Sequence, residues 1–418
     1  MKLRFGLDDR PNFGALCLYG LQWLMIAIPV VLTSTFIAPA GETVVYTQKL
    51  FALMGITMIL QVMWGHRMPL IAGPAAVLLM GIIAAIQQGH AADSIYPSMM
   101  IGGIIITLCA MTGILRYIQR AFTPRVVISI MLLISFTIAK PIVGMIFGDA
   151  SHSLLSFILV VAVPIAMATA NDLLKGVWKT MVVILSMILG SLLFYALTEF
   201  PSDFISDDHK TSLILGSMNF DTGLIIAFIF CYIALLINQA GSVQSLGEMV
   251  GADNMERRQN RGLFITGIMN IVCGAAGVIG PVDYSLSPGV VASTSCASRH
   301  TILPAAISML VIALLPDVVA AMLTIPAPIM GIVLLYLMAT QLAAGFHLIE
   351  ETKGVTSFRE GMILAIPIMV TVIMAFAPAS VLSAIPSLLR PILGNSFVVG
   401  ILTVLLLEHL FLRKKSTK

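Results

Sequence analysis

Residues 277–299 read GVIGPVDYSLSPGVVASTSCASR, a stretch that no continuous membrane helix accommodates. Apolar sequence lies on both sides, so we expect the stretch at membrane depth. Glycines and prolines interrupt it between Gly280 and Gly289, and Asp283 adds a carboxyl group. Broken backbone in hydrocarbon leaves N–H and C=O groups unpaired, at several kcal/mol each. The stretch therefore belongs inside protein or against a water-filled cavity; an external loop between two helices is the alternative.

A second interrupted stretch, PLIAGPAAVLLMG at residues 69–81, lies in the first half of the chain. Hydrophobic segments that Gly or Pro interrupts at corresponding positions of two halves point to the binding site of a transporter. The two stretches predict a duplicated fold with its site between the halves.

The composition identifies the class of protein. The 418 residues are 59% hydrophobic and 10% charged, with a mean hydropathy of +1.02. Soluble domains carry about 25% charged residues, so we interpret the chain as an all-α polytopic membrane protein. The basic residues are scattered in short loops, and nucleic-acid binding is not expected. The five cysteines form no C-x-x-C pair and no metal motif is present, so we expect no metal and no cofactor.

Apolar segments of roughly 17–25 residues can cross a bilayer, and fourteen segments are expected here. The first is longer than a signal-peptide core of about 7–15 residues and is interpreted as a retained span. The third and tenth are expected to be half-helices entered through short extended stretches. Residues 378–395, with three prolines, are placed at the outer surface. The expected segments are 14–37, 44–64, 70–87, 97–117, 125–147, 152–171, 179–197, 222–247, 261–279, 284–297, 302–323, 329–347, 361–377 and 396–412.

The distribution of charge predicts that both termini are cytoplasmic. With the N-terminus inside, only Lys49, Lys140, Lys210 and Arg390 of the 23 lysines and arginines fall outside or near the outer face. Basic residues favour the cytoplasmic side. Seven segments per half is an odd number, so the second half is expected upside down relative to the first, as 7+7 inverted repeats.

Short blocks along the chain carry a family resemblance. They are GLQ at 20–22, FTPRV at 122–126, NQAGSVQSLGEMVG at 238–251, RGL at 261–263 through CASR at 296–299, IPAPIMG at 325–331 and LLEHLF at 406–411. In this order they resemble the nucleobase–ascorbate transporter family, the xanthine and uracil permeases, and within it divergent bacterial purine permeases with a Gln-Trp pair in the first helix.

The resemblance implies two domains, each built from both halves. Segments 1–4 (residues 1–121) and 8–11 (222–325) would form a core domain. Segments 5–7 (122–221) and 12–14 (326–418) would form a gate domain. The resemblance also implies the bacterial cytoplasmic membrane as the location, coupling to H+ or Na+, and a homodimer.

The functional residues of that family carry over poorly. Its helix-eight glutamate, which holds the base, falls on Asn238, and the histidine or aspartate one turn later falls on Ser242. The glutamate or glutamine of helix ten falls on Leu286 and the residue before it on Ser285. A phenylalanine of helix three falls on Ala76. Both expected acids are therefore absent.

Amide, hydroxyl and backbone groups are left to bind a substrate. Asn238 and Gln239 donate and accept hydrogen bonds but cannot titrate; alternatively, they bond helices together, as polar residues do in membranes. Gln22, in the glutamine-containing first helix, is a further candidate, as is Ser287 in the broken stretch.

The half-helices offer a site without charged side chains. If they begin near Ala75 and Gly289, each contributes roughly half a positive charge and free N–H donors. Such a site suits a carbonyl-rich base and also suits an anion.

Asp283 is the only carboxylate of the broken stretch, and intramembrane ionisable residues are functional candidates. It either replaces the missing proton site or lies in water at the outer mouth, which we favour. His66 is assigned to an inner loop.

The sequence thus predicts a secondary or facilitative transporter of purines or other nucleobases, in which the core moves against the gate. Because Asn238 and Leu286 cannot titrate, we expect proton coupling to be weak, absent or relocated to Asp283. A small-anion or organic-acid carrier on the same fold is the alternative. The chain contains no G-x-S-x-G, paired catalytic aspartates or metal cluster, so an enzyme is not expected; nor is a channel.

Overall fold

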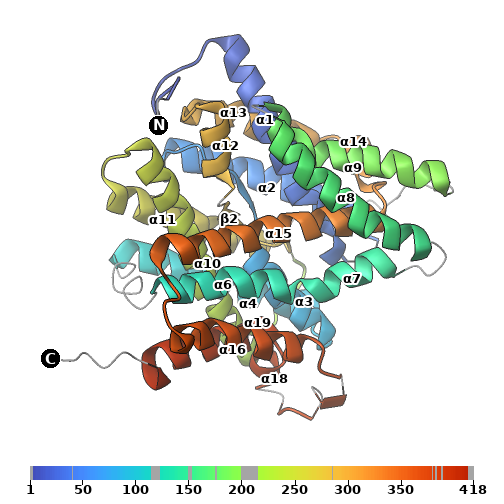
Figure 1. The fold of residues 1–418 in the computed structure, drawn as a ribbon, viewed down its shortest axis with the longest axis vertical. Coiled ribbons are helices and arrows are strands. Elements are labelled where there is room, and N and C mark those ends of the chain that lie inside the picture. Colours follow the sequence, from blue (N-terminus) through green and yellow to red (C-terminus); the bar gives the residue numbers. More distant parts are fainter. Residues whose placement is uncertain are drawn as a thin grey trace.

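The structure is a computed structural model that describes residues 3–39, 41–113, 123–148, 153–174, 177–198, 215–284, 286–378, 380–381, 384–386 and 389–412. Helices make up most of this part of the chain, and two very short strands lie among them (Figure 1). The end of the fourth expected segment, most of the loop 198–221 and part of residues 378–395 fall outside the described residues.

The elements follow the expected segments closely. Those of the first half are α1 (Phe13–Leu32), η1 (Thr35–Ile37), α2 (Thr43–Met63), β1 (Ala72–Pro74), α3 (Ala76–Gln87), α4 (Ala92–Thr112), α6 (Pro124–Thr137), α7 (Ala139–Phe147), α8 (Ser153–Leu173) and α9 (Val177–Leu197). Those of the second half are α10 (Thr222–Val250), α11 (Met255–Ala275), β2 (Pro281–Asp283), α12 (Ser287–Thr294), η3 (Arg299–Thr301), α13 (Ile302–Ala313), α14 (Pro316–Leu323), α15 (Ala327–Thr352), α16 (Phe358–Ala375), α18 (Arg390–Leu393), α19 (Ser396–Leu406) and η4 (Leu407–Phe411).

Local sequence sets several helix ends. The side chains of Asn12, Thr123 and Asp221 accept backbone N–H groups at the starts of α1, α6 and α10, which satisfies donors that the helix itself leaves free. Gly113 and Gly251 adopt left-handed backbone after α4 and α10, a conformation that costs glycine little.

The two broken stretches meet at the centre of the fold. β1 and β2 pair antiparallel, with Ala72 opposite Asp283 and Pro74 opposite Pro281. Ala75 N–H also donates to Gly280 O at 2.9 Å, extending the pairing toward the half-helices. The expected short extended stretches before the third and tenth helices are confirmed. The pairing satisfies backbone groups that would otherwise be unpaired in an apolar interior.

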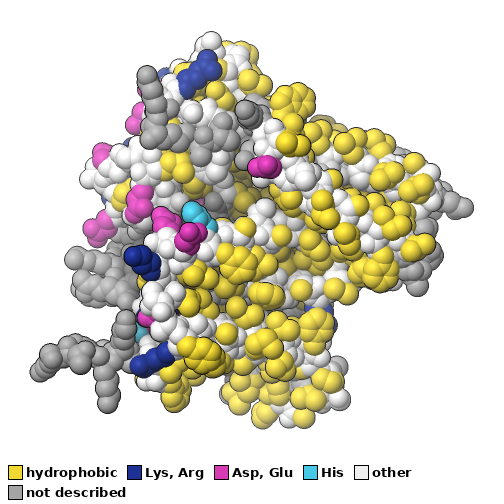
Figure 2. Space-filling view, in the orientation of Figure 1, with side chains coloured by type: hydrophobic (Ala, Val, Ile, Leu, Met, Phe, Trp, Pro, Cys, Tyr) yellow, Lys and Arg dark blue, Asp and Glu magenta, His cyan; other side chains and the backbone are white. Residues whose placement is uncertain are grey.

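Eight helices within the described residues are long and apolar enough to cross a membrane, or nine if the bent pair Arg299–Ala313 and Pro316–Leu323 is one span. Ala76–Gln87, Met181–Leu197 and Ser396–Phe411 are shorter apolar helices. Hydrophobic side chains cover most of the face in Figure 2, and charged side chains gather along one edge. The apolar surface is that expected of a membrane-spanning protein.

Two expected segments are wrong in detail. The segment 302–323 is not one helix: α13 and α14 meet at a bend of 95°, where Pro316 at the start of α14 cannot continue the preceding ladder of hydrogen bonds. The segment 284–297 contains only the eight-residue α12, which ends at Ser295 in left-handed backbone. Beyond it, Cys296 forms a parallel bridge with Phe5 of the N-terminal segment.

Long-range packing joins the halves. α4 packs on α11, α2 on α13, and α6 on α15 and α16. Glycines permit the first of these contacts, because a Cβ on Gly103 would lie 3.0 Å from the carbonyl oxygen of Gly267.

Candidate functional site

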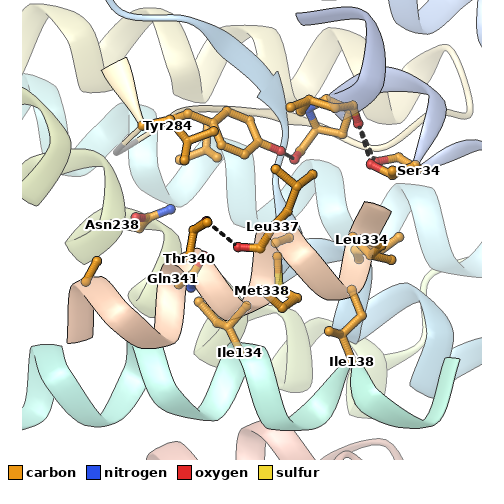
Figure 3. Close-up of a pocket in the computed structure, with 18 residues that line it drawn as sticks. Ser34, Ile134, Ile138, Asn238, Tyr284, Leu334, Leu337, Met338, Thr340 and Gln341 are labelled. Atoms are coloured by element: carbon orange, nitrogen blue, oxygen red, sulfur yellow. Dashed lines mark hydrogen bonds between the residues drawn. The ribbon is translucent and has the colours of Figure 1, made fainter. Parts of the chain in front are cut away.

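A cavity of about 110 Å³ lies beside the paired strands (Figure 3). One wall comes from α1, β1, α3, α10 and the region of β2 and α12; the other comes from α6 and α15. The lining residues are Val30, Thr33, Ser34, Pro74, Ala76, Leu79, Ile134, Ile138, Asn238, Val282, Tyr284, Leu286, Leu334, Leu337, Met338, Thr340, Gln341 and Ala344. None of these described residues is charged, so a ligand here meets hydrogen-bonding groups and apolar walls.

Both half-helices begin at this cavity. Ala75 precedes α3 and Leu286 precedes α12, and neither supplies a side-chain cap. Ala76 and Leu286 line the cavity. N–H groups in the first turn of a helix have no partner within the helix, so each half-helix can offer donors to a ligand that carries acceptors.

Asn238 is the polar side chain best placed to bind a ligand. Its carboxamide faces the cavity from α10 (Figure 3), and no hydrogen bond of that carboxamide is recorded within the described part of the chain. The Ser34 hydroxyl donates to Val30 O at 3.3 Å and the Thr340 hydroxyl to Leu337 O at 2.7 Å. The Tyr284 hydroxyl donates to Pro74 O. These hydroxyl hydrogens are thus committed to the protein, while the Asn238 amide can both donate and accept.

Behind the cavity lies a buried polar cluster centred on Asp283. Asp283 and His66 are both fully buried, and His66 Nε2 lies 3.3 Å from Asp283 Oδ2. The side-chain amide of Gln239 donates to the same oxygen, and Gln61 Nε2 lies 3.3 Å from it. The expectation that Asp283 lies in water at an outer mouth is wrong, because β2 places its side chain inside the protein.

The elements around this cluster hold it in place. Gln61, near the end of α2, also donates to Gly262 O at 3.0 Å and Thr266 Oγ1 at 2.9 Å, both on α11. His66 follows α2 in a turn, so its assignment to a loop was correct, but its side chain points inward. Gly262 makes room, since a Cβ there would lie 3.2 Å from that of His66.

The predicted site residues fall into three groups. Asn238, Leu286 and Ala76 line the cavity. The others that the structure describes do not line it: Gln22, Ala75, Gln239, Ser242, Asp283, Ser287 and Gly289. Ser285 lies outside the described residues.

The second group has other contacts. The Ser287 hydroxyl accepts Ile71 N–H at 3.0 Å, and the Ser242 hydroxyl donates to Asn238 O at 2.9 Å. Gly289 is exposed. Gln22 is buried, and its Nε2 has no hydrogen-bond partner among the described residues.

Sequence reasoning missed the α6–α15 wall and His66. Gln341 contributes the amide of that wall, donating to Met131 O at 3.4 Å. Its one sequence signal is an amide within an otherwise apolar segment. His66 carried no signal beyond its residue type, because its partner is more than 200 positions away.

The chain is similar to proteins described as permeases. The protein of Bacillus subtilis named "Putative purine permease YwdJ" is 22% identical over 96% of this chain and 97% of its own length. "Nucleobase transporter PlUacP" of Paenibacillus larvae is 21% identical over 92% of this chain and 91% of its own length. The solved transmembrane domain of the cyanobacterial bicarbonate transporter BicA covers 88% of this chain and 98% of its own, with a TM-score of 0.66 and 15% identity. At that identity the likeness concerns the fold alone.

The family follows from a match along most of the chain. Residues 14–380 match the Xan_ur_permease model, described as the Permease family. This range includes both broken stretches, the cavity and the buried cluster. The chain therefore belongs to the Permease family.

Proposed function

We propose that this permease carries nucleobases of the purine, xanthine or uracil class across the bacterial cytoplasmic membrane. The observation that carries the proposal is the uncharged cavity at the broken strands, with the free carboxamide of Asn238 facing it. A nucleobase is planar, and its ring edge presents adjacent donors and acceptors. One carboxamide can pair with such an edge, and the apolar walls contact the ring faces. The names of the relatives support the same substrate class.

The transport step is a movement of two domains. Residues 1–121 and 222–325 form the core, and residues 122–221 and 326–418 form the gate. The cavity has walls from both sets, so a displacement of one set against the other changes its access. Fourteen segments in 7+7 inverted repeats are supported by the antiparallel pairing of β1 with β2. Cytoplasmic termini and a homodimer complete the proposed arrangement.

Coupling to an ion is weak, absent or relocated to Asp283. Within the cavity lining, Asn238 and Leu286 occupy the positions where the nucleobase–ascorbate family has acids, and neither can exchange a proton. Coupling to H+ or Na+ then depends on a group outside the lining, and Asp283 lies directly behind it.

A small-anion or organic-acid carrier is the second candidate. The starts of α3 and α12 at a cavity without carboxylates favour it, because helix N-termini attract negative charge. The fold shared with a bicarbonate transporter is consistent with this candidate.

Thermal stabilisation of the purified protein separates the two candidates. Nucleobases, ureides and small organic and inorganic anions are tested one at a time. A ligand that binds only the folded form stabilises it by about 2.7 kcal/mol at a hundredfold excess over Kd. Stabilisation by a purine or pyrimidine that Asn238→Ala abolishes supports the first proposal. Stabilisation by anions alone overturns it in favour of the second.

A further inference from the structure

The cluster behind the cavity contains a carboxyl group that the cavity itself does not use. Asp283 Oδ2 is crowded: the amides of Gln239 and Gln61 and Nε2 of His66 all approach it. Its other oxygen, Oδ1, is buried and has no hydrogen-bond partner among the described residues. A buried carboxylate is costly unless both oxygens are satisfied and its charge is balanced.

The neighbouring histidine does not balance that charge. Met68 N–H donates to His66 Nδ1 at 3.0 Å, so Nδ1 carries a lone pair and not a proton. The ring is therefore neutral, with its one hydrogen on Nε2, the atom that faces Asp283 Oδ2. An imidazolium would need a second hydrogen on Nδ1, pointing at the Met68 amide hydrogen. With an ionised Asp283 the pair would carry a net charge of about −1 in a dry interior.

No other charged group compensates for it. On α2 and α10 the facing side chains are the neutral amides Gln61 and Gln239, and on α11 the facing side chain is the Thr266 hydroxyl. Arg258 of α11 is the nearest cation recorded, but it donates to the backbone oxygen of His66 at 3.0 Å and pairs with Asp253. Ala72, opposite Asp283 on β1, is apolar. His66 and Asp283 are thus the titratable side chains of this cluster within the described structure.

One further hydrogen resolves the pattern. Gln61 Oε1 is, like Asp283 Oδ1, a buried acceptor without a partner, and the two side chains are neighbours, with Gln61 Nε2 3.3 Å from Oδ2. Two adjacent unpaired acceptors are what remains when a donor hydrogen is missing. A proton on Oδ1 turns that oxygen into a donor and removes the net charge.

We propose that Asp283 is a proton-binding site, occupied in this conformation, and that His66, Gln61 and Gln239 form its shell. Uptake forms an O–H bond at Oδ1 and discharges the carboxylate. Release breaks that bond, sends the proton to bulk water and leaves a carboxylate that accepts from His66 Nε2–H. The proposal rests on the proposed transport function and identifies the group that would couple it to a proton.

Two covalent connections link this site to the cavity. Gln239 is bonded to Asp283 and directly follows Asn238 in α10. Val282 and Tyr284 flank Asp283 in the chain and line the cavity. A change of charge at Asp283 therefore acts on both sides of the ligand position.

Infrared spectroscopy of the purified, ligand-free protein tests the proposal. A protonated carboxylic acid has a C=O stretching band separate from the bands of carboxylates. We expect a band that disappears as the pH is raised, is absent in Asp283→Asn, and persists in the control Asp317→Asn. In His66→Leu, which removes a donor to the carboxylate, the band should disappear at a higher pH than in the unmodified protein.

Several results would overturn the proposal. They are no such band at any pH, a band that survives in Asp283→Asn, or a band that Na+ abolishes at constant pH and ionic strength, which would indicate a sodium site. If Asp283→Asn does not fold, carboxyl-¹³C labelling of aspartate replaces it, because an aspartic acid band must then shift. The measurement needs no substrate, so its failure is distinguishable from failure of the nucleobase proposal.

Discussion

Gln239 is bonded to Asp283 in both directions. Its side-chain amide donates to the Asp283 carboxyl group, and its side-chain oxygen accepts the Asp283 backbone N–H at 2.8 Å. One residue of α10 thereby fixes both the side chain and the backbone of β2. The strand that lines the cavity is consequently held by a helix that also lines it.

Gln239→Leu should destabilise the protein by about 1–3 kcal/mol, because it leaves buried polar groups of Asp283 without partners. Thermal or denaturant unfolding in detergent measures the loss. Gln244→Leu, on the same helix but with an exposed bond to Glu248, is the control and should change stability by about 0.5 kcal/mol or less. Equal losses in the two variants would contradict this account of Gln239.

Gln341→Ala should weaken ligand binding, because its amide belongs to the α6–α15 wall of the cavity. Loss of one neutral hydrogen bond costs about 0.5–1.5 kcal/mol, or roughly 2- to 13-fold in Kd. Ligand titration of the thermal midpoint measures the change. The control is Gln48→Ala, whose amide bonds Ala313 O away from the cavity. Unchanged affinity in Gln341→Ala would remove this wall from the binding site.

Arg125 joins three helical elements through an ion-pair network. It contacts Glu360 of α16 at 3.0 Å and Glu408 of η4 at 3.0 Å. Arg125→Leu leaves two largely buried glutamates unpaired, and we expect a loss of about 3 kcal/mol in unfolding free energy. Adding Glu360→Gln and Glu408→Gln to that variant should recover part of the loss. No recovery in the triple variant would show that charge is not the cause.

Two glycines should respond oppositely to alanine. A Cβ on Gly267 would lie 2.8 Å from the backbone nitrogen of Thr107, so Gly267→Ala should separate α11 from α4 at about 1–3 kcal/mol. Gly241 of α10 has no atom within 4 Å of such a Cβ, so Gly241→Ala should be neutral or stabilise by up to about 1 kcal/mol. The two thermal midpoints decide; the same sign of change in both would contradict the packing argument.

The local sequence predicted the elements that depend on neighbours in the chain. Gly280, Pro281 and Pro288 break any helix wherever they lie, so the extended stretch and the short α12 could be predicted without coordinates. The bend between α13 and α14 was missed although Pro316 marks it, because hydropathy alone reads 302–323 as one apolar segment.

By itself, then, the sequence determined that this is a helical membrane permease with two interrupted segments, because hydropathy and Gly/Pro chemistry act locally. Only the tertiary structure decided which residues share a site. It buried Asp283 against His66, moved Gln239 behind the cavity and placed Gln341 in the opposite wall. Such contacts join residues up to hundreds of positions apart, and their burial depends on how the helices pack, which no local pattern encodes.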